Sequence, residues 1–121
     1  VLFRSAYTAG QPYVGATLSM HAGSAAQVLL AWEEPDRLHR GLLGARFTAT
    51  QLSAVRRRGW AQSVGEREPG VASVSAPVFE SDRRVVAVLS VSGPTERLGP
   101  SPAAKWGAAL KDATARLSAE L

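Results

Sequence analysis

The chain has 121 residues, of which 45% are hydrophobic, and it carries a formal net charge of +4 at pH 7. This length predicts one domain with a single modest core. The absence of cysteine and the wide separation of His21 and His39 exclude a disulfide framework and predict no metal or cofactor. No apolar stretch is long enough to cross a bilayer and no secretion leader stands at the start, so we expect a cytoplasmic protein without membrane contacts.

The positive charge is dispersed along the chain. Basic residues extend from Arg4 to Arg116 with acidic residues among them, so no patch for nucleic acid is predicted. The basic run at residues 56–58 is expected to end a helix, where the partial negative charge of the last carbonyl groups favours cations. We therefore expect no specific DNA binding by this chain alone.

Two helices are predicted in the first third of the chain, after a short strand and loop within residues 1–14. Residues 22–32 are small and apolar without proline, which predicts a helix whose first-turn amides are accessible. A second helix is predicted over residues 34–40, because Pro35 suits a first turn and Gly41 follows as a terminator.

A third helix is predicted from a capping box, because Thr48 and Gln51 have the spacing at which each side chain bonds the other residue's amide. This helix is expected to end at Gly59, which suits the left-handed position after a helix. Residues 60–64 then resume an extended pattern, and the charged and helix-breaking residues 65–70 predict a loop.

Residues 70–94 predict a β-hairpin with an unusual number of serines. Side chains alternate between the two faces of a strand, and cross-strand partners share a face. If the loop has an even number of residues, Ser73 lies opposite Ser92 and Ser75 opposite Ser90, which gathers four hydroxyl groups on one apolar face. An odd loop would place Ser73 opposite Val91 and scatter the hydroxyl groups over both faces.

The same hairpin has a second interpretation, in which its small serines only allow a helix to pack closely on the sheet. The second strand is largely apolar on both faces, which predicts a central position in the sheet. After the hairpin, Ser101 and Pro102 predict the start of a closing helix with a serine N-cap. Its buried side is expected to contain Ala104, Leu110, Ala113, Leu117 and Leu121.

A set of short motifs follows a fixed order along the chain: LSMHA at 18–22, Thr48, VRRRGW at 55–60, Glu66, GV at 70–71, APV at 76–78 and LSVSGP at 89–94. In this order they resemble the effector-binding domain of IclR-type bacterial transcription regulators over residues 14–121. The sequences of residues 22–32 and 55–78 are most similar to those of actinobacterial regulators of leucine and other amino-acid biosynthesis. Residues 1–13 match poorly and form a separate segment.

The resemblance implies an α+β, GAF-like fold, with a curved antiparallel sheet flanked by helices and a ligand pocket on one face. It also implies that the domain here lacks its first strands and that the winged helix-turn-helix domain is absent from this chain. By position, the implied ligand-binding residues are Leu18, Ser24, Ala25, Val71, Ser73, Ser90 and Ser92. Ser63 stands where some members have an acidic pocket residue, and Ser73 where some have cysteine, so the identity of the ligand does not transfer.

The function implied is sensing of a small carboxylate or amino acid by a homo-oligomeric regulator that contacts DNA through another domain. We expect the helix-start amides to hold the acid group and no nearby cation to compete for it. One alternative is an oligomerisation module with a non-functional cavity. The other is a small serine hydrolase, which is disfavoured because no Gly-x-Ser-x-Gly motif occurs and neither histidine has an evident serine and carboxylate partner in the sequence. No catalytic residue and no enzyme activity are therefore predicted.

Overall fold

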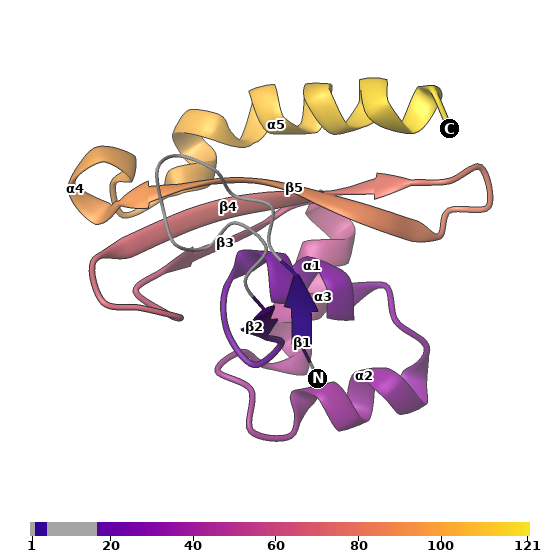
Figure 1. Cartoon of the computed structure of the whole chain (residues 1–121), viewed down its shortest axis with the longest axis horizontal. Helices are drawn as coiled ribbons and strands as arrows, with labels where there is room; N and C mark the ends of the chain where they lie inside the picture. The colour runs from indigo at the N-terminus through magenta and orange to yellow at the C-terminus, as the bar shows by residue number, and fades with distance from the viewer. Residues whose placement is uncertain (1, 5–16) are drawn as a thin grey trace.

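A three-stranded antiparallel sheet lies at the centre of the structure (Figure 1). This computed structural model describes residues 2–4 and 17–121, with side chains from residue 19 onward. The sheet has the order β3-β4-β5, with β3 at Ala61–Val64, β4 at Val71–Phe79 and β5 at Val85–Pro94. A separate antiparallel ribbon is formed by β1 (Leu2–Arg4) and β2 (Thr17–Ser19).

Five helices accompany the sheet in the part of the chain that the structure describes. They are α1 (Ser24–Ala31), α2 (Pro35–Leu42), α3 (Ala49–Arg58), α4 (Thr95–Leu98) and α5 (Pro102–Ala119). The predicted capping box at the start of α3 is confirmed, because Thr48 Oγ1 accepts from the Gln51 amide and Gln51 Oε1 accepts from the Thr48 amide. Gly59 ends α3 in the left-handed conformation, with φ of 84°.

The sheet separates two layers of helix (Figure 1). On one face, Val74 and Ala76 of β4 pack against Leu110 of α5 in a small apolar cluster. On the other face, α1 and α3 form the larger core together with Ala61 and the partly buried Val88. This arrangement confirms the predicted α+β architecture, and it directs the odd-numbered side chains of β4 toward α1.

The hairpin has the register that gathers the serines. Ser73 pairs with Ser92 and Ser75 with Ser90. The loop between the strands has five residues, 80–84, but an irregularity at Phe79 pairs this residue with Val85 and leaves Val86 as an extra residue. A β-bulge adds one residue to one strand and thereby restores the alternation that an odd loop would have broken.

The structure corrects two expectations about the elements after the loop. β5 is at an edge of the three-stranded sheet, and β4 is the central strand. The sequence predicted a central position for β5 because both of its faces are apolar. In the structure these two faces pack against helices on opposite sides of the sheet, so an apolar pattern does not require a strand on each side.

The closing helix also differs from its predicted pattern. Its buried residues are Pro102, Gly107, Leu110 and Thr114, whereas Leu117 is 43% exposed and Leu121 63% exposed. Ser101 precedes the helix but makes no side-chain cap. The short helix α4 was not predicted at all.

Candidate functional site

Serine side chains form two neighbouring rows on the face of the sheet that α1 covers. The strand register places Ser63 of β3, Ser73 of β4 and Ser92 of β5 side by side. In the next row, Ser75 of β4 lies beside Ser90 of β5. The strand alternation thus brings hydroxyl groups from three strands to one surface.

Ser24, at the first turn of α1, connects the two rows. Its Oγ lies 2.6 Å from Ser73 Oγ and 2.7 Å from Ser75 Oγ. Ser73 Oγ is also 3.0 Å from Ser63 Oγ, and Ser75 Oγ is 2.6 Å from Ser90 Oγ. We call these five residues the serine network, a continuous line of hydroxyl groups in the order Ser63, Ser73, Ser24, Ser75 and Ser90.

The centre of the serine network and its Ser63 end are buried, and only the Ser90 end is exposed. Ser24 is 1% exposed and Ser75 is fully buried, whereas Ser73 is half-buried and Ser90 is exposed. Ser92 is half-buried, and its hydroxyl has no hydrogen-bond partner among the described residues. The hydroxyl groups of Ser90 and Ser92 therefore combine access from solvent with unused hydrogen-bonding capacity.

The beginning of α1 is already occupied by a carboxylate of the chain. Glu66 Oε1 accepts a hydrogen bond of 2.7 Å from the amide of Gly23, the N-cap residue. The side chain of Gln27 donates to the same carboxylate, at 3.4 Å and 3.3 Å from its two oxygens. The expectation that this helix start is open for a ligand is therefore wrong for the Gly23 amide, because a residue from a distant loop satisfies it.

A cation also lies at this helix start, contrary to the prediction that none would. Nη2 of Arg67 donates to the carbonyl oxygens of Ser19 and Ala22, and its guanidinium group lies directly beside Gly23. Arg46 Nη1 donates to the Glu66 carbonyl oxygen at 2.8 Å. The loop after β3 is thus held at the start of α1 by an acidic side chain, Glu66, and by a basic side chain, Arg67.

The remaining predicted ligand residues are more peripheral. Ala25 is half-buried in the first turn of α1, and Val71 is 36% exposed at the start of β4. Leu18 belongs to β2, but its side chain lies outside the described residues. Ser75 was absent from the predicted site residues although its pairing with Ser90 was foreseen, and Ser63 was noted only as a departure from the family pattern. Strand alternation pointed to Ser75, whereas the place of Ser63 beside Ser73 depends on the pairing of β3 with β4.

The serine network contains no group suited to activate a nucleophile. Among the residues that the structure describes, the hydrogen bonds of these side chains join only serine hydroxyl groups to one another. The two histidines are exposed, and the structure gives neither side chain a hydrogen bond to a serine of the network. An activated serine needs a base within hydrogen-bond reach, so this arrangement favours binding over hydrolysis.

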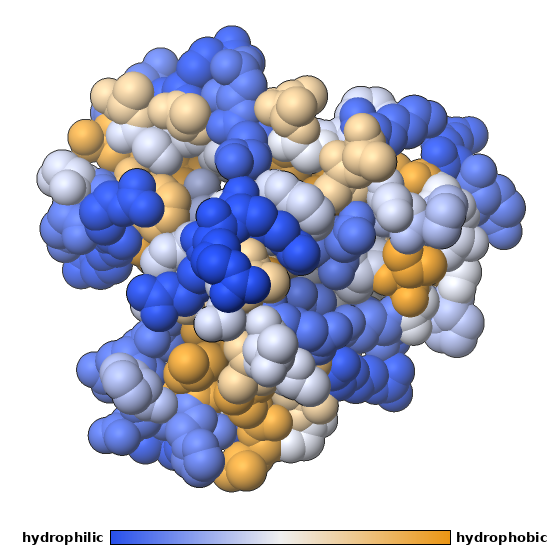
Figure 2. All heavy atoms as spheres, turned by 180° about the vertical axis from the view of Figure 1, so that it is seen from behind, coloured by the Kyte–Doolittle hydropathy of each residue, from blue (hydrophilic) through white to orange (hydrophobic). Residues whose placement is uncertain are grey.

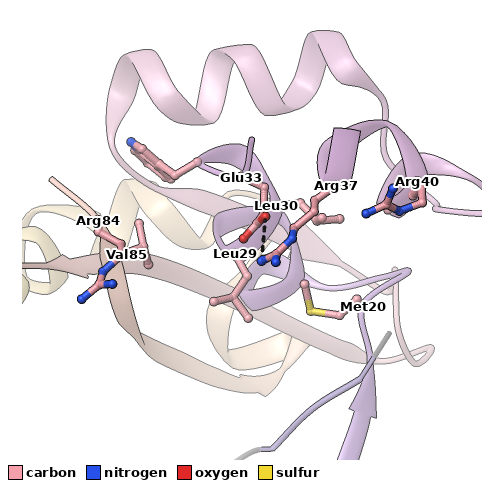
Figure 3. Close-up of a pocket in the computed structure, with 10 residues that line it drawn as sticks. Met20, Leu29, Leu30, Glu33, Arg37, Arg40, Arg84 and Val85 are labelled. Carbon is pink, nitrogen blue, oxygen red and sulfur yellow. Dashed lines mark ion pairs between the residues drawn. The ribbon is translucent and has the colours of Figure 1, made fainter. Parts of the chain in front are cut away.

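A cavity of about 460 Å³ lies between α1, α2 and the start of β5, apart from the serine network (Figure 3). Met20, Leu29 and Leu30 give it an apolar lining, and Glu33 and Arg37 form an ion pair at its edge. None of the serine network lines this cavity. Because none of the predicted ligand-binding residues lines this cavity, the serine network remains the stronger candidate site.

Comparison with known proteins identifies the family. The family described as "Bacterial transcriptional regulator IclR C-terminal" matches residues 4–119. The Glycerol operon regulatory protein of Streptomyces griseus is 34% identical over 122 residues, which cover 89% of this chain and 48% of that protein. The transcriptional regulator XynR of Escherichia coli K12 is 31% identical, with the same two coverages. The chain thus spans about half the length of these relatives.

Solved structures show the same fold. An IclR transcriptional regulator from Silicibacter sp. TM1040 is 28% identical with a TM-score of 0.78, over 95% of this chain and 50% of that chain. The C-terminal domain of E. coli KdgR is 27% identical with a TM-score of 0.73, over 88% of this chain and 73% of that chain. The sequence match and the fold lead to one conclusion: this chain belongs to the IclR family of bacterial transcriptional regulators and corresponds to their C-terminal domain.

Proposed function

We propose that this domain senses a small carboxylate or amino acid at the serine network and thereby modulates DNA binding by a separate winged helix-turn-helix domain. The observation that carries the proposal is the gathering of six serines, the network and Ser92, on one face of the sheet beside a helix start. Hydroxyl groups donate and accept hydrogen bonds, so they suit a small polar ligand.

The acid group is expected to bind the two serines of β5 rather than the helix start. Ser90 and Ser92 lie two residues apart on one face of the strand, so their hydroxyl groups can reach the two oxygens of one carboxylate. The Gly23 amide is unsuited to this role because Glu66 already satisfies it. Val71, which is 36% exposed at the start of β4, would contact the apolar part of the ligand, and Leu18 stays a predicted ligand residue.

The response is expected in the assembled regulator. XynR and KdgR of Escherichia coli K12 are named as regulators of the helix-turn-helix type, and the matched part covers less than half of each, which supports a DNA-binding domain outside the matched part. We expect the regulator to act in the cytoplasm as a homo-oligomer. In the described part of the chain, no helix is long and apolar enough to cross a membrane. The narrower similarity to regulators of amino-acid biosynthesis remains a prediction.

An oligomerisation module with an unused cavity is the second candidate function. It is favoured by the exposed edge of β5, where Val86 is 43% exposed. The two candidates differ in one measurable property, since a sensing domain binds its ligand saturably and an oligomerisation module is indifferent to metabolites.

Isothermal titration calorimetry of the chain against a panel of small carboxylates and amino acids tests the proposal. We expect saturable binding without turnover of the ligand. Replacing Ser90 and Ser92 together by alanine should weaken binding by about 0.5–1.5 kcal/mol for each lost hydrogen bond. Ser53→Ala, at an exposed position of α3, is the matched control and should leave binding unchanged. Equal affinity of the double variant and the parent would reject the serine face as the site.

A further inference from the structure

The serine network has a fixed number of hydrogens, and this number limits what it can offer to a ligand. Each serine hydroxyl carries one hydrogen and can accept through its lone pairs. The network contains five hydroxyl groups joined by four hydrogen bonds, in each of which either oxygen can be the donor. Four hydrogens are used inside the network, so one hydrogen alone can point outward.

Burial decides which hydroxyl can provide the outward hydrogen. Ser24 is 1% exposed and Ser75 is fully buried, so neither reaches a ligand. Ser63, at the far end, is only 8% exposed, so the outward hydrogen belongs to the exposed Ser90 or to the half-buried Ser73. When Ser90 donates outward, every other hydroxyl must donate along the network toward it, and the far end can then only accept.

We propose that this coupling makes the site selective for acids that also carry a hydrogen-bond donor, such as hydroxy acids or amino acids, over the corresponding oxo acids. The inference rests on the proposed function, in which the carboxylate binds at Ser90. With Ser90 donating to the carboxylate, the half-buried Ser73 donates to Ser24 and presents only lone pairs to the rest of the ligand. A ligand hydroxyl or ammonium group donates to these lone pairs, whereas an oxo group faces them without a hydrogen.

The surroundings of the two ends support this orientation. At the Ser90 end, Ser92 adds a second hydroxyl that is not tied to any described residue. At the other end, Gln27 donates both to the Glu66 carboxylate and to the carbonyl oxygen of Gln62, the residue before Ser63. The Gln27 and Gly23 donors at that end are thus already used by the chain, which favours the β5 end for an acid group.

Ser24 and Ser75 are positioning residues in this scheme, because they transmit the orientation of the hydroxyl groups without reaching the ligand. Removing either hydroxyl divides the network into two parts. Each part then has its own outward hydrogen, so the far end can donate or accept regardless of what Ser90 does. The preference for a donor-bearing ligand should disappear while the carboxylate contact at Ser90 persists.

The test compares four-carbon acids that differ at one position: butanoate, 2-hydroxybutanoate, 2-aminobutanoate and 2-oxobutanoate. Calorimetry on the chain should show the hydroxy or amino acid binding about tenfold more tightly than the oxo acid, because a mismatched polar contact leaves buried lone pairs unsatisfied. In Ser24→Ala the ratio of affinities should fall to about one. Ser75→Ala interrupts the same line at another point and should give the same result, which covers the case in which one variant fails to fold.

Ser92→Ala is the matched control, because Ser92 lies on the same face but outside the serine network. It should weaken binding of all four acids by a similar factor and preserve their ratio. If the acids bind the parent chain with equal affinity, or if the ratio survives in Ser24→Ala and Ser75→Ala, the coupling is refuted while the proposed function stands. If none of the acids and no other member of the wider panel binds, the proposed function fails and the coupling with it.

Discussion

Glu66 supplies the hydrogen-bond acceptor for the N-cap amide of α1, although it lies far from this helix in the sequence. Its carboxylate accepts from the amide of Gly23, which lies 43 residues away in the chain. In a capping box the same bond to the N-cap amide comes from the third residue of the helix itself, which here is Ala26 and has no acceptor. The carboxylate also places negative charge at the positive end of the helix dipole, which stabilises α1.

We predict that Glu66→Ala lowers the free energy of unfolding by about 1–3 kcal/mol, because the partly buried Gly23 amide and the Gln27 side chain lose their acceptor. Urea unfolding followed by circular dichroism measures the loss. Glu120→Ala removes an equally charged but exposed side chain and should change stability by less than about 0.5 kcal/mol. Equal stability of the two variants would show that the contact does not stabilise the fold.

At the scale of elements, α5 is also started by a residue outside it. Gln62 of β3 accepts from the Ala103 amide through Oε1 at 2.9 Å. Ala103 is the second residue of the helix, which is the position that an N-cap side chain normally satisfies. At the other end, Ser118 accepts from the Phe79 amide at 3.0 Å. Both contacts fix α5 along the sheet.

The start of α5 provides the second prediction. Gln62→Ala should destabilise the protein by about 1 kcal/mol, as the loss of an N-cap does. Ser101→Ala should have almost no effect, although Ser101 is the N-cap residue by position, since its side chain makes no cap. Comparing the urea midpoints of the two variants checks this. A larger effect of Ser101→Ala would contradict the assignment of the cap to Gln62.

At the scale of the whole molecule, helices cover both faces of the sheet, but the outer edge of β5 has no neighbouring strand in the described structure. This strand is an edge of the three-stranded sheet in the described structure, and Val86 at its bulge is 43% exposed. The side of the molecule in Figure 2 is largely hydrophilic, with hydrophobic residues in separate patches. An edge strand offers unpaired backbone groups to a second chain, so β5 is the expected place of self-association.

We predict that the 121-residue chain shows concentration-dependent self-association in sedimentation velocity. A charge at a strand edge opposes pairing with another strand, so Val86→Lys should shift the chain toward monomer. Leu43→Lys adds the same charge at a residue that is 65% exposed and follows α2, far from the strand edge in sequence, and should leave association unchanged. Monomeric parent protein at all concentrations would contradict this assignment.

The sequence by itself determined the features that depend on neighbouring residues. The capping box of α3 and the glycine that ends this helix were predicted because both are built within one short segment. Strand alternation also predicted the cross-strand pairs, Ser73 with Ser92 and Ser75 with Ser90. The sequence could not show that a five-residue loop with a bulge, rather than an even loop, produces this register.

Tertiary structure alone decided which distant groups meet. Glu66 and Gln62 supply the caps of α1 and α5, and no local pattern distinguishes them from other polar residues. Likewise, Ser24 joins the two rows of serines only because α1 packs across the sheet at that point. Local periodicity is imposed by bonds along the chain, whereas such long-range partners are selected by the packing of whole elements, which brings together side chains whose separation in sequence carries no signal.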